Sequence, residues 1–194
     1  MTCGLILAAG ESRRMGSPKA LLEYRGETFL DRLIGLLSRR CSPVIAVLGA
    51  QRETVRAGLR RSAEAILVEN PDFPSGQLSS MQCGLRAVPA DAEAVLFALV
   101  DHPAVAPATI DALLDSATPA PLRMPRFHGR RGHPILISRL LLPEFLALPA
   151  RSSAKEVVTQ HAAGIAYIDV DDPGILADVD DPAAYASLLA GSGP

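Results

Sequence analysis

Near its N-terminus the chain reads Gly4-Leu5-Ile6-Leu7-Ala8-Ala9-Gly10-Glu11-Ser12-Arg13-Arg14-Met15-Gly16-Ser17-Pro18-Lys19, an apolar run followed by a loop rich in small and cationic residues. The apolar run does not alternate with polar residues, which is typical of a strand covered on both faces. In an open α/β sheet, ligands bind beyond the carboxyl ends of the strands. The stretch therefore predicts a buried strand that ends in a ligand-binding loop.

The composition of this loop favours an anionic ligand such as a triphosphate. A turn at Gly10 lets backbone N–H groups converge on an anion. Arg14 supplies a forked donor for phosphate oxygens, and Lys19 supplies a point charge. A P-loop is excluded because Gly10 and Gly16 are six apart and Ser17 follows the second glycine. The fingerprint G-x-G-x-x-G is absent as well, which argues against a Rossmann-type oxidoreductase.

Further apolar runs alternate with segments of helical periodicity along the first 116 residues. Apolar runs occupy residues 43–48, 65–68 and 94–100, and helical patterns occupy residues 28–37, 52–61, 79–88 and 107–116. A strand that alternates with a helix in this way is typical of a doubly wound α/β fold with a mostly parallel sheet.

Prolines and glycines interrupt the pattern after residue 117. We expect a strand-loop-strand excursion here, then helices at 138–148, 153–162 and 182–190 and a strand at 165–170. No linker divides the chain, so we predict one domain over residues 1–190. Its nucleotide-binding half is residues 1–116, its acceptor-binding half is residues 117–190, and residues 191–194 form a frayed tail.

The composition excludes several classes of protein. The chain has 194 residues, 48% of them hydrophobic, and a net charge of −2, which argues against nucleic acid as a partner. Its three cysteines contain no C-x-x-C pair, so neither a zinc ribbon nor a dithiol site is indicated. The N-terminus lacks a signal peptide, and no apolar run is long enough to cross a bilayer. We therefore expect a cytoplasmic protein with no membrane partner.

The spacing Leu7-Ala8-Ala9-Gly10-x-Ser12-x-Arg14-Met15-Gly16-x-x-Lys19 resembles the signature of the molybdenum-cofactor nucleotidyltransferases and their relatives. Four further segments follow in the order of that family: 76–81 (Gly-Gln-Leu-Ser-Ser-Met), 99–103 (Leu-Val-Asp-His-Pro), 129–134 (Gly-Arg-Arg-Gly-His-Pro) and 178–182 (Asp-Val-Asp-Asp-Pro). The resemblance implies a three-layer, Rossmann-like nucleotidyltransferase fold of the nucleotide-diphospho-sugar transferase type. It also implies that an acceptor phosphate attacks the α-phosphate of a nucleoside triphosphate (NTP) and releases pyrophosphate.

The resemblance also assigns roles to the loop. It implies nucleotide binding by Leu7, Ala8, Ala9, Gly10 and Ser12, with backbone contacts from Ala9 and Gly10. Arg14 and Lys19 would contact the phosphates and act in catalysis. The alternative is that these two cations are merely solvated loop residues.

Asp101 directly follows the apolar run 94–100, so its carboxylate is expected in the ligand crevice. Magnesium prefers one or two carboxylates together with phosphate oxygens and waters. Asp101 matches the metal aspartate of the family, and Asp180 resembles its second metal ligand. Asp101 can alternatively be a turn residue, and Asp178, Asp180 and Asp181 also fit the start of a helix. The sequence leaves open whether Asp178 or Asp180 is the second ligand of Mg²⁺.

The base of the NTP is expected against residues 69–83. Asn70, Ser79 and Ser80 offer donors and acceptors for a pyrimidine edge, although Ser79 also fits a helix N-cap. The Leu-Ala-Ala-Gly stretch resembles the cytidylyl branch of the family, which favours CTP over GTP. Gln77 departs from that branch, where Met is frequent.

The acceptor is expected against the second half of the chain. Arg131 would pair with its phosphate, while His133 would bind the acceptor or merely shape the turn before Pro134. The chain lacks the family's Gly-Asp-x-Gly-Ala-Arg segment, and Lys155 would replace its arginine as an acceptor contact. The alternative is that Lys155 is a solvated residue in the first turn of a helix.

These features together predict transfer of CMP to a phosphorylated small-molecule acceptor, with molybdopterin favoured. Rival interpretations are a guanylyltransferase for the same acceptor, a transferase for a sugar or alcohol phosphate, and a non-catalytic module that delivers cofactor to a transient partner molybdoenzyme.

Overall fold

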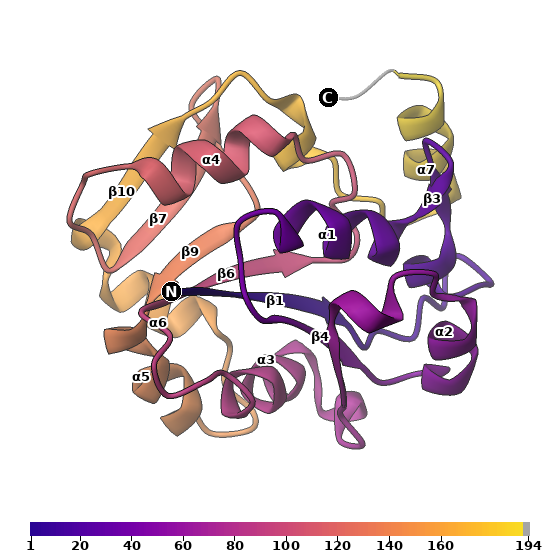
Figure 1. Ribbon diagram of the computed structural model, residues 1–194, viewed down its shortest axis with the longest axis horizontal. Coiled ribbons are helices and arrows are strands. Elements are labelled where there is room, and N and C mark those ends of the chain that lie inside the picture. The colour runs from indigo at the N-terminus through magenta and orange to yellow at the C-terminus, as the bar shows by residue number, and fades with distance from the viewer. Residues whose placement is uncertain (192–194) are drawn as a thin grey trace.

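A mixed sheet runs through the middle of the computed structural model, which describes residues 1–191 (Figure 1). Its strands are β1 (Thr2–Ala8), β4 (Val44–Leu48), β5 (Ile66–Glu69), β6 (Ala94–Leu99), β7 (Leu122–Phe127), β8 (Arg130–Arg131), β9 (Ile135–Ser138) and β10 (Ile165–Asp169). They lie in the order β10-β7-β9-β6-β1-β4-β5, and β8 pairs with β7. A small separate ribbon joins β2 (Glu23–Tyr24) to β3 (Glu27–Thr28).

Strand direction divides this sheet into two parts. The strands β6, β1, β4 and β5 are parallel, as the apolar runs predict. Strand β9 is antiparallel to both of its neighbours, β6 and β7, whereas β10 is again parallel to β7. The predicted doubly wound, mostly parallel fold is therefore confirmed, with β9 reversed at the junction of its halves and the short β8 antiparallel to β7.

Helices cover both faces of the sheet and make a three-layer molecule (Figure 1). One face carries α1 (Phe29–Ser38), α2 (Arg52–Gly58) and α4 (Pro107–Asp115), and the other carries α3 (Gln77–Arg86), α5 (Leu142–Ala147) and α6 (Lys155–Gln160). The last helix, α7 (Pro182–Leu189), packs on Phe29 at the start of α1 through Leu188. None of the helices within residues 1–191 has the length and apolar character needed to cross a membrane.

Strand β1 shows why the first apolar run does not alternate. Ile6 and Ala8 face the α1 layer, whereas Leu5 and Leu7 face the α3 layer, and all four are buried. A strand between two helical layers has no solvent-facing side, so every position favours an apolar residue.

The start of α1 confirms the helix signal at Thr28. The Thr28 hydroxyl oxygen accepts a hydrogen bond from the backbone N–H of Asp31 at 3.1 Å, as an N-cap does. The buried Asp31 carboxylate also accepts the backbone N–H groups of Arg60 and Arg61, at 3.0 and 2.8 Å. One short motif therefore caps a helix and fixes the chain entering β5.

Several predicted boundaries need correction. Helix α2 ends at Gly58 rather than residue 61, and α3 begins at Gln77 rather than residue 79. The N-cap of α3 is Gly76, so Ser79 lies inside the helix. Strand β5 lies at the sheet edge and is partly exposed, although its sequence resembles a buried strand. Of the predicted frayed tail, residues 192–194 lie outside the described residues.

Candidate active site

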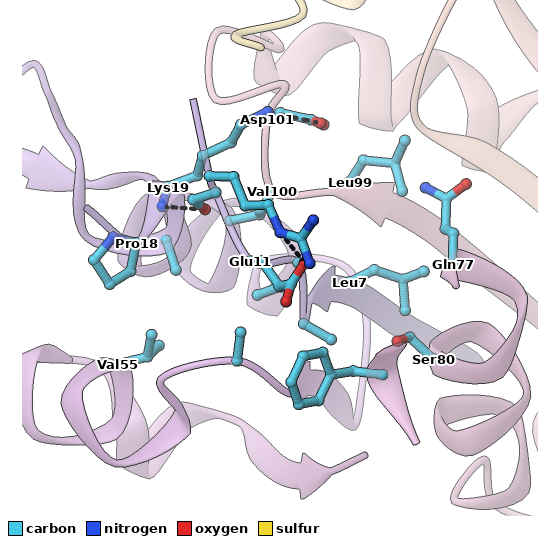
Figure 2. Close-up of a pocket in the computed structure, with 18 of the residues that line it drawn as sticks. Leu7, Glu11, Pro18, Lys19, Val55, Gln77, Ser80, Leu99, Val100 and Asp101 are labelled. Atoms are coloured by element: carbon cyan, nitrogen blue, oxygen red, sulfur yellow. Dashed lines mark hydrogen bonds and ion pairs between the residues drawn. The ribbon is translucent and has the colours of Figure 1, made fainter. Parts of the chain in front are cut away.

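A cavity of about 450 Å³ lies at the carboxyl ends of β1 and β6 (Figure 2). Parallel neighbouring strands end at the same edge of a sheet, so the two loops that follow them meet there. Its walls come from residues 7–14, 18–20 and 99–101, together with Ala50, Val55, Phe73, Pro74, Gly76, Gln77, Ser80 and Asp180. In this view Lys19 and Asp101 lie on one side of the cavity, and Gln77 and Ser80 lie on the other.

The loop after β1 is shaped by its own hydrogen bonds. The Ser12 hydroxyl accepts the backbone N–H of Lys19 at 2.9 Å, and its carbonyl accepts the N–H of Met15 at 2.9 Å. Ser12 and Gly16 both have positive φ, at 51° and 70°. Glycine adopts such a conformation without steric cost, whereas serine needs support from its surroundings. Ser12 therefore fixes the loop and aims Lys19 into the cavity.

Lys19 contacts both of the predicted metal-binding residues. Its ammonium nitrogen lies 2.5 Å from Asp180 Oδ1 and 3.7 Å from Asp101 Oδ2, and its side chain is 14% exposed. The Arg14 guanidinium lies 3.3 Å from Asp180 Oδ2. The structure thus brings together Arg14, Lys19, Asp101 and Asp180, which three separate sequence motifs supply.

The two carboxylates that flank Lys19 differ in their electrostatics. The hydrogen bond from Lys19 lowers the pKa of Asp180 below its ordinary value. Burial raises the pKa of Asp101, although the Lys19 charge opposes this effect. Asp180 is therefore a stable anion in the free protein, whereas Asp101 carries the larger cost of losing water.

Asp101 also belongs to a second group of possible metal-ligand atoms. Asp101, His102 and Asp178 each offer one ligand atom, and these atoms all lie within 4.8 Å of one another. Burial lowers the pKa of His102 and raises that of Asp178. The negative charges of Asp101 and Asp180 raise the pKa of Asp178 further. Asp101 Oδ1 is buried and has no hydrogen-bond partner among residues 1–191.

The predicted base contacts separate into two kinds. Ser80 is buried in the cavity wall, whereas Asn70 and Ser79 do not line the cavity. The Asn70 amide donates to the hydroxyls of Ser79 and Ser80, both at 3.0 Å, and its oxygen accepts the N–H of Asp72 at 3.0 Å. These bonds hold the loop before α3 in place and occupy the polar groups that the base would need. A direct contact of Asn70 or Ser79 with the base stays a prediction.

The predicted acceptor residues are likewise divided. His133 and Lys155 line a second, mostly apolar cavity of about 240 Å³, which shares Gly76, Gln77 and Leu99 with the first. Arg131 is exposed on β8 and does not line either cavity. A role for Arg131 in acceptor binding stays a prediction.

His133 is mostly enclosed by other rings. Its ring centroid lies 5.9 Å from that of Phe97 and 5.1 Å from that of His102. Burial lowers the pKa of His133 to about 4. The ring is therefore neutral at pH 7 and acts as a flat wall of the second cavity.

The sequence analysis missed several residues of the cavity wall. Phe73 and Pro74 form part of it after β5, and Gln77 stands at the junction of the two cavities. Gly49 makes this arrangement fit, because a Cβ atom there would lie 2.7 Å from Phe73 Cβ and 2.6 Å from the Ala9 carbonyl oxygen. The signal that could have found them is the position of Gly49 directly after a buried strand, which indicates a close backbone approach.

Comparisons with known proteins agree with this geometry. A family model described as "MobA-like NTP transferase domain" matches residues 4–165. The chain is 34% identical to a nicotine blue oxidoreductase of Paenarthrobacter nicotinovorans, over 96% of this chain and 95% of that one. It is 26% identical to the molybdenum cofactor cytidylyltransferase of Escherichia coli, over 92% and 90% of the two chains. The Mycobacterium tuberculosis protein Rv0371c, solved as a complex with manganese, superimposes with a TM-score of 0.79 at 28% identity, over 97% and 98% of the chains.

Proposed function

The chain belongs to the MobA-like NTP transferase family, and we propose that it transfers CMP from CTP to a phosphorylated acceptor and releases pyrophosphate. Its fold is the Rossmann-like nucleotidyltransferase fold, and its relatives make it an enzyme of the molybdenum-cofactor cytidylyl- or guanylyltransferase type. CTP, Mg²⁺ and molybdopterin as the acceptor are the finer parts of the proposal.

One observation carries the proposal. Lys19 projects from an anion-binding loop into a cavity large enough for a nucleotide, where it contacts Asp180 and lies 3.7 Å from Asp101. A mobile cation held by carboxylates can exchange those partners for phosphate oxygens when a triphosphate enters. Arg14, which is exposed and reaches the same Asp180, supplies a second donor.

The chemistry is an in-line displacement at the α-phosphorus. An ionised oxygen of the acceptor phosphate forms a new P–O bond, and the bond to the β-phosphate oxygen breaks. The leaving pyrophosphate keeps the electron pair of that bond. The nucleophile is already ionised, so no general base is needed, and Lys19 and Arg14 stabilise the charge that develops on the phosphates.

A divalent cation fits the carboxylates at the mouth of the cavity. Asp101 and Asp180 both face Lys19 Nζ, so their oxygens converge on one region that also borders the anion-binding loop. Oxygen ligands of this kind suit Mg²⁺ bound together with a triphosphate. When bound there, Mg²⁺ would neutralise charge on the triphosphate and on the departing pyrophosphate. The manganese complex of Rv0371c supports a divalent metal in this family.

The preference for CTP rests on the stretch Leu7-Ala8-Ala9-Gly10, which resembles the cytidylyl branch, and on Ser80 in the cavity wall. The preference for a molybdopterin acceptor rests on the cytidylyltransferase relative and on the second cavity, which adjoins the first at Gln77. Lys155 lines that second cavity and can pair with the acceptor phosphate.

The first test is thermal stability with each of the four NTPs, with and without Mg²⁺. A ligand at about 100 times its dissociation constant adds about 2.7 kcal/mol of stability. For a domain of this size we expect a rise in melting temperature of roughly 5–10 °C with CTP and Mg²⁺. A shift with GTP alone would instead favour guanylyl transfer, and no shift with any NTP would contradict the proposal.

The second test is pyrophosphate release with molybdopterin as acceptor. Asp101→Asn should lower turnover at least about 100-fold while the fold stays intact. Asp115→Asn is the matched control, because Asp115 lies on α4 and pairs with Arg40, away from both cavities. Equal turnover of Asp101→Asn and wild type in saturating Mg²⁺ would refute the role of Asp101.

A second candidate function is oxidoreduction of a planar compound. The relative named nicotine blue oxidoreductase is 34% identical over nearly the whole chain, and the apolar cavity beside Phe97 and His133 suits a planar molecule. Nicotine blue, mixed with the protein and an added reductant, tests it directly. Loss of its absorbance that depends on the protein, without pyrophosphate release from any NTP, would move the assignment to this activity.

A further inference from the structure

We infer that the two oxygens of the Asp101 carboxylate serve two different cation positions. Oδ2 faces Lys19 and Asp180, where the nucleotide is proposed to bind. Oδ1 lies 3.9 Å from His102 Nε2, and Asp101, His102 and Asp178 together form a second site, which binds a divalent first-row transition metal without any nucleotide. This second site goes beyond the proposed function, because it requires neither NTP nor turnover.

The donor atoms of this second site are close enough to share one ion. The ligand atoms of Asp101, His102 and Asp178 lie within 4.8 Å of one another. Donors of an octahedral ion with bonds of about 2.1 Å are about 4.2 Å apart on opposite sides of the ion and about 3.0 Å apart on adjacent sides. The ligand atoms must therefore approach one another by less than about 2 Å. Asp178 is exposed, so its side chain is able to make that adjustment.

A separate observation is that two polar atoms in this cluster are buried without a partner. Asp101 Oδ1 and His102 Nδ1 have no hydrogen-bond partner among residues 1–191. The side chain of His102 is 10% exposed, and its Nε2 lies 3.9 Å from Asp101 Oδ1. Buried polar atoms are normally paired, and an unpaired one needs a physical reason such as an absent ion.

Within the described part of the chain, the ion pairs near Asp101 involve Asp180 but not Asp178. Lys19 and Arg14 both contact Asp180. Asp178 takes part in none of the ion pairs that the structure shows within residues 1–191. Asp178 therefore has no ion-pair partner of its own among these residues, and a divalent ion would balance its charge together with that of Asp101.

A backbone hydrogen bond joins the two segments that carry the proposed ligands. His102 follows Asp101 directly after β6, and Asp178 precedes α7 in a segment far along the chain. The N–H of Val179, next to Asp178, donates to the Asp101 carbonyl at 2.9 Å. The two ligand-bearing segments are thus joined before any ion arrives, which lowers the entropy cost of forming the site.

The ligand set predicts which ions bind. An imidazole nitrogen favours ions such as Co²⁺, Ni²⁺ and Zn²⁺ over Ca²⁺ and Mg²⁺, which prefer oxygen alone. The nucleotide side of Asp101 offers only carboxylate oxygens from Asp101 and Asp180 and suits Mg²⁺. Different ions should therefore bind preferentially at the two positions.

The test is a titration of the nucleotide-free protein with Co²⁺ alone, followed by the visible absorption of bound Co²⁺. We expect the wild type to bind about one Co²⁺ per chain. Asp178→Asn should weaken this binding at least about tenfold, and His102→Gln should do the same. Asp180→Asn is the matched control and should retain it.

The inference is overturned if the wild type binds no Co²⁺, or if Asp180→Asn abolishes the binding while Asp178→Asn retains it. Because Asp178 is exposed, its variant keeps the test valid even where His102→Gln fails to fold. The Mg²⁺-dependent shift with CTP tests the proposed function separately, so failure of one leaves the other standing.

Discussion

Lys19 Nζ and Asp180 Oδ1 lie 2.5 Å apart although 161 residues separate them in the chain. The contact joins the loop after β1 to the segment before α7, and both segments lie at the carboxyl edge of the sheet. Because Arg14 reaches the same carboxylate, the free protein holds over the cavity the two cations that are proposed to bind phosphate.

Lys19→Gln should lower kcat/KM for the NTP roughly 100-fold, because a charge that contacts the phosphates is lost. Arg13→Gln is the control within the same loop. Arg13 is 81% exposed and pairs with its neighbour Glu11. Steady-state kinetics at several NTP concentrations measure both variants. Activity of Lys19→Gln within about threefold of wild type would remove Lys19 from the catalytic residues.

Asn70→Ala should lower the free energy of unfolding by about 2 kcal/mol, because it leaves buried polar groups without their partners. Asn70 is 4% exposed and bonds both Ser79 and Ser80. Ser75→Ala in the same loop should cost less than about 0.5 kcal/mol, since Ser75 is exposed. Urea denaturation compares the two variants. If Asn70→Ala keeps wild-type stability but changes the NTP preference, Asn70 reads the base instead.

Gly84→Ala should destabilise the protein by about 1–3 kcal/mol, although alanine normally favours a helix. A Cβ atom at Gly84 would lie 2.4 Å from Leu5 Cδ1, and Leu5 is fully buried in β1. Gly35→Ala in α1 meets the flexible Arg61 side chain at 3.1 Å and should be neutral or slightly stabilising. Melting temperatures of the two variants should therefore move in different directions. A stabilised Gly84→Ala would contradict the close packing of α3 on β1.

The stability of the protein should fall as the pH drops from 6.5 to 4, in part because of His133. In the folded state burial lowers the pKa of His133 to about 4, from an ordinary value of 6.5. The unfolded chain therefore binds a proton in this range while the folded chain does not, which removes roughly 3 kcal/mol by pH 4.

Urea denaturation at a series of pH values measures this effect. His133→Gln should flatten the pH dependence, whereas His128→Gln should preserve it. An unchanged profile in His133→Gln would show that other groups cause the acid sensitivity.

The sequence alone predicts the part of the site that lies at the carboxyl ends of the strands. Asp101 follows an apolar run, and Lys19 ends a loop that follows another. Because both runs are parallel strands, their loops had to meet at one edge. The contact with Asp180 followed only from the resemblance to a family, since the local pattern there fits a helix start equally well.

Other features depend on contacts that no local pattern encodes. Asn70 resembles a base-binding residue, but Ser79, Ser80 and Asp72 occupy its polar groups. Arg131 is exposed because β8 pairs with Arg126 and Phe127 at the end of β7. Which strands pair with one another depends on contacts between residues far apart in the sequence. His102 was not singled out, because the proximity of Asp178 depends on a bond between segments about 75 residues apart.

The reversed strand β9 has a consequence for how the chain folds during synthesis. In the finished sheet β9 covers the edge of β6 along Ala94–Phe97, yet it is made almost forty residues later. Until Ser138 has left the ribosome, the apolar β6 presents unpaired backbone groups to its surroundings. Such an edge is a template for pairing with other chains. A longer delay between the emergence of β6 and that of Ser138 should therefore promote aggregation, and a chaperone that covers β6 during this interval should prevent it.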